Sequence, residues 1–163
     1  MTLRIVPLGG LGEIGMNCLA IEQPDGILVV DAGITFPHQD LGGDVYHPDF
    51  SWLDQHADRV VGVFLTHGHE DHVGALPYLL EHLDVPVFGP PHALAMAKRR
   101  LVEHDFASHD LDLHEVRAGS LTRVGPFEVE AIRVSHSIVE ASALCIETAE
   151  GFVVHTGDFT FDD

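Results

Sequence analysis

The sequence predicts an α/β fold in which helices pack on a mixed β-sheet. Short strands joined by turns open and close the chain, whereas strands alternate with helices in its middle part. The composition agrees, because 163 residues with 45% hydrophobic and 21% charged side chains can bury a core. No repeat or Ser/Pro-rich linker interrupts the pattern, so we expect one domain over residues 1–163.

The first part of the chain has the pattern of a β-meander followed by a loop. Pro24–Gly26 has the composition of a tight turn between two strands, and a polar loop rich in Gly, Pro and His covers residues 33–50. A short helix is expected to begin at Ser51. The three expected strands are Leu3–Pro7, Asn17–Glu22 and Ile27–Asp31.

Strands and helices alternate in the middle of the chain. The apolar run Val60–Leu65 predicts a buried strand, and a short strand is expected at Val85–Phe88. Gly74–His82 and His92–Glu103 have helical spacing of apolar residues. The pattern then returns to strands, which are expected from Leu121 onward and at Phe127–Val134, Ala143–Glu147 and Phe152–Thr156.

The sequence shows no pattern of a membrane helix or a secretory signal, and its two cysteines do not form a reactive or metal-binding motif. No apolar run approaches the roughly 20 residues of a membrane helix, and the N-terminus lacks the basic-then-apolar pattern of a secretory signal. We therefore expect a cytoplasmic protein that does not enter a membrane. Cys18 and Cys145 lie far apart in apolar segments, which predicts buried thiols rather than a disulfide or a thiolate metal site.

The charge balance gives no indication of a nucleic-acid partner. Twenty-six acidic residues against 8 basic ones leave a formal net charge of −18, whereas proteins that bind nucleic acids usually present a basic surface. The only basic cluster is Lys98–Arg100, which we expect on the solvated face of a helix.

A glycine-rich segment near the N-terminus matches a dinucleotide-binding motif. Gly10–Gly15 has the pattern G-x-G-x-x-G after an expected strand, and Asp31 follows near the distance of a ribose-binding acid. That motif requires a helix at its glycines, yet Cys18–Ile21 has strand-like composition and a turn closes the segment soon after. A glycine-rich turn between two strands is therefore the preferred interpretation.

The segment His67–His72 carries the strongest chemical signal in the sequence. It contains three histidines and an aspartate within six residues, directly after a buried strand. Imidazole nitrogens and carboxylate oxygens are ligands that divalent metals such as zinc prefer. A histidine-rich surface loop is the alternative, since the chain has 13 histidines. Further along the chain, His136 and Asp158 each follow an expected strand, which adds two candidate ligands.

Together these segments resemble the metallo-β-lactamase superfamily, whose H-x-H-x-D-H motif is followed by a distant histidine and then an aspartate. Within it, the chain is similar to the β-CASP nucleases, the ribonuclease J family in particular. The resemblance spans essentially the whole chain. It is carried by Leu8–Asn17, Asp31–Gly33, Leu65–Gly74 and His155–Phe159.

The resemblance implies the four-layer α+β metallo-β-lactamase fold, here its N-terminal part, and a site for two divalent metal ions. Zinc is the expected metal and manganese the alternative. His67, His69 and His136 would bind one ion, Asp71 and His72 the other, and Asp158 both. Asp31 would orient the ligand loop without touching a metal. Some members hold a structural calcium near Gly42–Asp44, which implies Gly42 and Asp44 as its ligands.

The implied activity is hydrolysis of RNA phosphodiesters, exonucleolytic, endonucleolytic or both, in RNA processing and decay. A hydroxide shared by the two cations would attack the phosphorus, with Asp71, His72 and Asp158 as the residues nearest the reaction. No serine or cysteine nucleophile is needed. The remaining histidines are then expected on the surface, and they include His38, His56, His82, His104, His109 and His114.

The chain also departs from the family pattern. Ribonuclease J continues with an inserted β-CASP domain, the rest of the lactamase domain and a further histidine ligand, so we expect this sequence to be partial. The complete form is expected to bind RNA and to be a homo-oligomer. Two other interpretations stay open: a lactamase-fold hydrolase of thioesters or lactones, and a metal-binding fragment that is inactive in isolation.

Overall fold

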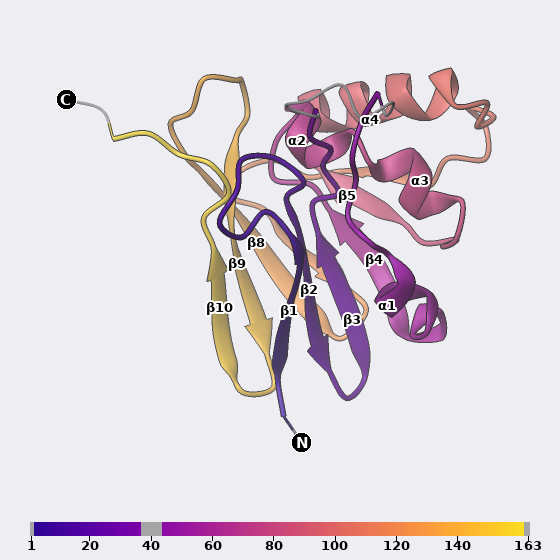
Figure 1. Cartoon of the computed structure of the whole chain (residues 1–163). Coiled ribbons are helices and arrows are strands. Elements are labelled where there is room, and N and C mark those ends of the chain that lie inside the picture. Colours follow the sequence, from indigo (N-terminus) through magenta and orange to yellow (C-terminus); the bar gives the residue numbers. More distant parts are fainter. Residues whose placement is uncertain (1, 37–43, 162–163) are drawn as a thin grey trace.

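Two β-sheets pack face to face and helices cover the outer face of the larger sheet (Figure 1). The computed structural model describes residues 2–36 and 44–161. The larger sheet has six strands in the order β1-β2-β3-β4-β5-β6, antiparallel from β1 to β3 and parallel from β3 to β6. Its strands are β1 (Arg4–Gly9), β2 (Cys18–Gln23), β3 (Gly26–Val30), β4 (Val60–Phe64), β5 (Val87–Gly89) and β6 (Leu113–Glu115).

The central strand β3 is apolar along its whole length because both of its faces are covered. Ile27 and Val29 face the helices and belong to one core, whereas Leu28 and Val30 face the smaller sheet and belong to another. The helices of the first core are α1 (Ser51–Asp54), α2 (Glu70–Val73), α3 (Leu76–Leu80) and α4 (Pro91–Glu103), with a 3₁₀ turn at Ala57–Arg59.

The smaller sheet is antiparallel, in the order β10-β9-β8-β7. In β8 the residues Phe127, Val129 and Ala131 are buried against the larger sheet and alternate with exposed residues, which is the period of a strand with one covered face. The strands are β7 (Leu121–Val124), β8 (Phe127–Arg133), β9 (Ser142–Thr148) and β10 (Gly151–His155). The larger sheet is the expected mixed sheet, and the two packed sheets agree with the four-layer fold that the resemblance implies.

Two local expectations were inaccurate. The helix expected over Gly74–His82 is the shorter α3, and the one-turn helix α2 that precedes it was not predicted. The strand β6 was not predicted, because three residues with mostly exposed side chains carry no clear hydrophobic period. The glycine-rich segment is a turn between the antiparallel strands β1 and β2, as preferred, and none of the described residues 10–17 is helical.

The strand ends gather the candidate residues at one edge of the two sheets. Asp31 follows β3 and His67 follows β4, and because these strands are parallel, their C-terminal ends lie at the same edge. The backbones approach closely there. A Cβ atom on Gly33 would lie 1.6 Å from the carbonyl oxygen of Asp71, so only glycine fits beside the ligand loop.

Candidate metal centre

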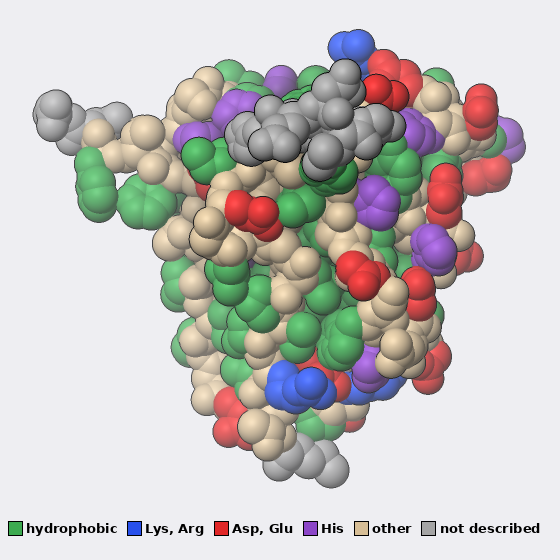
Figure 2. Space-filling view, in the orientation of Figure 1, with side chains coloured by type: hydrophobic (Ala, Val, Ile, Leu, Met, Phe, Trp, Pro, Cys, Tyr) green, Lys and Arg blue, Asp and Glu red, His purple; other side chains and the backbone are tan. Residues whose placement is uncertain are grey.

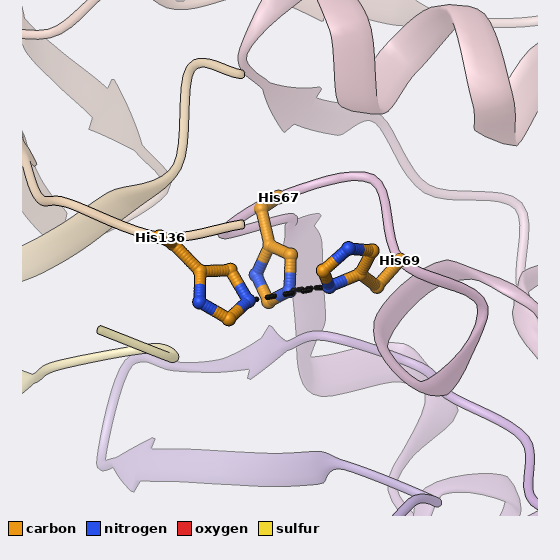
Figure 3. Close-up of side chains that lie close together, drawn as sticks. All are labelled: His67, His69 and His136. Atoms are coloured by element: carbon orange, nitrogen blue, oxygen red, sulfur yellow. Dashed lines mark hydrogen bonds between the residues drawn. The ribbon is translucent and has the colours of Figure 1, made fainter. Parts of the chain in front are cut away.

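Three histidine rings from two distant segments converge on one point (Figure 3). Nε2 of His67 lies 3.1 Å from Nδ1 of His69, which lies 3.2 Å from Nε2 of His136. His67 and His69 come from the loop between β4 and α2, and His136 follows β8. Ligand nitrogens at about 2.0–2.1 Å from a tetrahedral zinc ion lie about 3.3–3.4 Å apart. The observed spacing therefore fits three ligands of one such ion.

A second group of donor atoms lies beside the first. Nε2 of His72 is 3.7 Å from Oδ2 of Asp71 and 3.5 Å from Oδ2 of Asp158. The same Asp158 oxygen is 3.9 Å from Nε2 of His136. Asp158 is thus within reach of both groups, as a shared ligand must be. The six expected residues converge at one locus, although up to about ninety positions separate them.

The group around His72 differs in one respect from the expected ligand set. The tightest set of donors there is His67, His72 and Asp158, whose ligand atoms all lie within 4.8 Å of one another. Asp71 is close to His72 but does not belong to that set. His67 therefore lies between the two groups, and its ring centroid is 4.0 Å from that of His72.

Asp31 holds rings of both groups in orientation. Its Oδ2 lies 2.7 Å from Nδ1 of His72 and accepts a hydrogen bond of 2.8 Å from the Thr66 hydroxyl. That hydroxyl is in turn 3.0 Å from Nδ1 of His67. With Nδ1 of each ring engaged, Nε2 of each is turned toward the donor cluster. Asp31 is 1% exposed and has a φ of 60°, an uncommon backbone conformation for a residue other than glycine.

The electrostatics of the site favour neutral ligand nitrogens at the three-histidine group. Burial lowers the pKa of His67 to about 4, and the neighbouring His72 adds to the effect. Burial and then the proximity of His136 also lower the pKa of His69. A neutral imidazole has the free electron pair that a metal requires, so the group is suited to a cation at neutral pH.

The pair of Asp31 and His72 behaves differently because the two side chains are directly bonded. Burial disfavours the charged ring of His72, but the attraction of Asp31 outweighs it and raises the pKa of His72 to about 9. Burial likewise disfavours the charged carboxylate, yet His72 lowers the pKa of Asp31. Asp31 is therefore a charged, buried anion next to the donor cluster.

Sequence reasoning missed the role of Asn17. Its side-chain Nδ2 lies 3.1 Å from the carbonyl oxygen of Asp71, 3.3 Å from Oδ2 of Asp71 and 3.0 Å from Nε2 of His72. Its backbone N–H donates to the same Asp71 carbonyl at 3.0 Å. The glycine-rich turn thus ends on a residue that fixes the second group. The role of Thr66 in linking Asp31 to His67 was missed too. Its position directly before His67, at the end of the strand β4, could have indicated a supporting contact to the ligand loop.

The basic cluster Lys98–Arg100 lies on α4, as expected, and its arginines are paired. Nε of Arg99 is 2.9 Å from Oε1 of Glu103, and Nε of Arg100 is 3.0 Å from Oε2 of Glu70, next to the ligand loop. On the face shown in Figure 2, acidic side chains are spread widely, whereas basic ones gather at the top and near the bottom of the view.

The expected calcium ligands remain a prediction, and the expectation for the histidines outside the cluster is confirmed only in part. Gly42 lies outside the described residues, and Asp44 is exposed, so the calcium site stays a prediction. His82, His109 and His114 are exposed, as expected, and His38 lies outside the described residues. The expectation was wrong for His56 and His104, which are half-buried and pack against Trp52 and Tyr78.

The family model described as the metallo-beta-lactamase superfamily matches residues 11–163. The chain belongs to the metallo-beta-lactamase superfamily. The fold class predicted from the sequence is therefore confirmed.

Solved structures agree at the level of the fold. The metallo-beta-lactamase fold protein YhfI from Bacillus subtilis has a TM-score of 0.67 at 18% identity, with 99% of this chain and 64% of that chain covered. A protein of unknown function from Enterococcus faecalis has a TM-score of 0.71 at 20% identity, with 96% of this chain and 43% of that chain covered.

Within the metallo-beta-lactamase superfamily, curated relatives confirm the resemblance to ribonuclease J. The chain is 43% identical to ribonuclease J of Helicobacter pylori over 162 residues, which are 99% of this chain and 24% of that protein. It is 42% identical to ribonuclease J2 of Bacillus subtilis over 161 residues, covering 98% of this chain and 29% of the relative. The chain thus spans about a quarter of the length of the curated relatives it matches.

Among the described residues, no helix has both the length and the apolar character needed to cross a membrane.

Proposed function

We propose that residues 1–163 are the metal-binding domain of a metal-dependent ribonuclease of the ribonuclease J type, which hydrolyses phosphodiesters of RNA. The observation that carries the proposal is the 43% identity to ribonuclease J across 99% of the chain. The cluster of imidazole and carboxylate donors supports it independently, because such ligands suit the two divalent cations of phosphodiester hydrolysis.

The donor atoms assign a role to each side of the cluster. His67, His69 and His136 would hold one cation and Asp71 and His72 the other, with Asp158 shared. Zinc is the metal we propose and manganese the alternative, since both accept nitrogen and oxygen ligands. Two bound cations would supply a water-derived nucleophile at neutral pH and stabilise the negative charge that develops on the phosphate.

The remaining contributions come from the protein itself. Asp31 fixes the orientation of two imidazole rings, and Asn17 holds Asp71 and His72 in place. Supporting contacts of this kind raise metal affinity by keeping ligands in their binding geometry. The side chain of Asp158 is 45% exposed, so the substrate would approach from its side of the cluster.

We further propose that the complete protein acts on RNA in the cytoplasm as a homo-oligomer, which sedimentation would test.

The decisive experiment compares RNA with the substrates of other lactamase-fold hydrolases. The complete protein, of which residues 1–163 are the proposed metal-binding domain, is incubated with an end-labelled RNA oligonucleotide, a thioester and a lactone, with zinc or manganese and with a chelator. We expect cleavage of RNA that the chelator abolishes and the metal restores. Sizing of the labelled products separates removal of terminal nucleotides from internal cleavage.

Two histidine variants provide the matched comparison. His136→Ala should lower RNA cleavage by at least about 100-fold, since the loss of outer contacts to a ligand alone costs up to about 100-fold. His114→Ala removes an exposed histidine outside the cluster and should leave cleavage unchanged. Intact RNA together with a hydrolysed thioester or lactone would instead assign the site to the other hydrolases.

A further inference from the structure

The arginines of this acidic protein fall into two groups. Four of the seven form ion pairs with glutamates, and Arg123 donates to a carbonyl oxygen of its own turn. Arg117 and Arg133 are exposed and have no side-chain hydrogen bond or ion pair with any residue that the structure describes. These two cations are therefore available to an outside partner. The paired arginines are Arg4, Arg59, Arg99 and Arg100.

The two unpaired arginines line one cavity of about 320 Å³. Its wall also includes Pro90 and Pro91 at the start of α4, and Glu140. The Glu140 carboxylate already accepts a hydrogen bond of 2.8 Å from the backbone N–H of His92. The wall thus contains two arginines and one engaged carboxylate, a positive balance on a chain whose net charge is −18.

The fold brings the two arginines together from separate segments. The backbone N–H of Gly119 donates to the carbonyl of Ala131 at 2.7 Å, and the N–H of Ala131 donates to Ser120 at 3.2 Å, so the segment after β6 lies against β8. Arg133 shares the alternation of the buried Ala131 but lies at the end of β8, beyond the core. Its side chain therefore leaves the space between the sheets at their edge.

This cavity lies next to a second one, which a candidate metal ligand lines. A second cavity of about 410 Å³ is lined by His136 and shares both Arg133 and Glu140 with the first. Nε2 of His136 faces His69 in the three-histidine cluster. The two cavities are therefore neighbours, and a strand bound beside His136 would extend toward the two arginines.

We propose that Arg117 and Arg133 form a binding site for backbone phosphates of the RNA strand, next to the phosphate that is cleaved. The inference rests on the proposed ribonuclease function. A guanidinium group donates two parallel hydrogen bonds to phosphate oxygens, a geometry that suits a phosphodiester. On a strongly acidic surface, an unpaired cationic site beside the metal centre would also decide which path the polyanion follows.

The test removes both charges and compares two substrates of different length. The double variant Arg117→Ala/Arg133→Ala is set against Arg117→Lys/Arg133→Lys and against the control Arg99→Ala/Arg123→Ala, which loses the same charge elsewhere. Each is assayed on a single-stranded RNA oligonucleotide and on bis(p-nitrophenyl) phosphate, a diester without neighbouring phosphates. We expect the alanine double variant to lower the ratio of the two kcat/KM values by about 10-fold, mainly through the KM for RNA.

The salt dependence gives a second readout. Each lost phosphate contact to a single strand lowers the slope of log affinity against log salt by about 0.7, so the double variant should lose about 1.4. The lysine double variant keeps both charges but cannot donate the paired hydrogen bonds of arginine. Its ratio of kcat/KM values should therefore lie between those of the unaltered protein and the alanine double variant. An unchanged ratio and slope, or an equal loss in the control, would overturn the site. Loss of bound zinc in the alanine double variant would also overturn the site, because the two arginines would then support the structure of the metal centre and not the binding of RNA.

Failure of the proposed function would be visible separately. If the complete unaltered protein cleaves no RNA, the ribonuclease proposal fails, and the cavity is judged by fluorescence anisotropy of a labelled oligonucleotide. Weaker binding in the alanine variant alone supports the phosphate site, whereas equal binding in the alanine and control variants overturns it. An absence of binding by the unaltered protein overturns both proposals.

Discussion

The carboxylate of Asp31 lies 2.7 Å from Nδ1 of His72 and, through the hydroxyl of Thr66, is linked to Nδ1 of His67. One buried anion therefore orients two rings that belong to neighbouring donor groups. Nε2 of each ring faces the cluster because Nδ1 of each is held by Asp31 or Thr66, and Nδ2 of Asn17 also lies 3.0 Å from Nε2 of His72. Contacts outside the ligand set thus decide which ring nitrogen faces the cluster.

Replacement of Asp31 by asparagine should weaken metal binding by about 10–100-fold, the usual effect of removing a carboxylate that supports a ligand histidine. The amide keeps the volume of the side chain but loses the charge that holds His72. Competition titration of zinc against a chelator measures the change. Asp25→Asn, in the exposed turn between β2 and β3, is the control and should have no effect. Zinc affinity equal to that of the unaltered protein would refute the orienting role of Asp31.

The two metal positions should differ in affinity. The three histidines with Asp158 offer four ligands, whereas Asp71, His72 and Asp158 offer three. We therefore expect titration to resolve a tight and a weaker site. Asn17→Ala should weaken the weaker one by about 10-fold and leave the tight one unchanged, because Asn17 contacts only Asp71 and His72 among the ligands. Two equally tight sites, or an equal loss at both, would contradict this assignment.

The stability of the fold should depend on the ionisation of Glu22. Its carboxylate is paired with Arg59 at 2.6 Å and Arg4 at 2.8 Å, and the hydrogen bond from Arg59 is the main cause of its lowered pKa. A depressed folded-state pKa adds stability above the ordinary value of 4.5, and this stability is lost as the pH falls through the folded-state value.

Glu22→Gln should therefore lower the free energy of unfolding at pH 7 by about 1–2 kcal/mol, the range for a hydrogen bond to a charged group with partly exposed partners. The difference should shrink below pH 4.5. Denaturant melts at several pH values measure it. Glu128→Gln, on the exposed face of β8, is the control. A difference that stays constant down to the acid limit would exclude this linkage.

The two cysteines should differ in reactivity. Cys18 is 3% exposed, and burial followed by the charge of Asp31 raises the pKa of its thiol, so the reactive thiolate is scarce. Cys145 is only half-buried, which corrects the expectation that both thiols are buried. Iodoacetamide should modify Cys145 in the native protein and Cys18 only after unfolding, as mass spectrometry of peptides would reveal. Equal labelling of both thiols in the native state would disprove this.

The features predicted correctly from the sequence are those encoded in short contiguous segments. The buried strand β4 and the ligand loop after it follow directly from an apolar run that ends in His67–His72. The helix α4 was predicted within one residue for the same reason. Local patterns specify such elements because their hydrogen bonds and hydrophobic faces are set by near neighbours.

The features that were missed depend on residues far apart in the chain. Asn17 acts on Asp71, 54 positions away, and no local pattern indicates that contact. The strand β6 depends on its pairing with β5, which its own hydrophobic period does not indicate. Likewise, the unpaired state of Arg117 and Arg133 emerges only once the ion pairs of the other arginines are known.

The left-handed backbone at Asp31 sets strain in the main chain against the buried contacts of the side chain. A non-glycine residue with a φ of 60° costs roughly 1–2 kcal/mol. Glycine would relieve that cost but would leave His72 and Thr66 without their acceptor. The loss of these buried contacts would cost at least as much as the relieved strain, so the stability of the fold and the metal site both require the carboxylate. Stabilised variants of this domain are best sought elsewhere in the chain, because the strain at Asp31 is part of how the ligands are held.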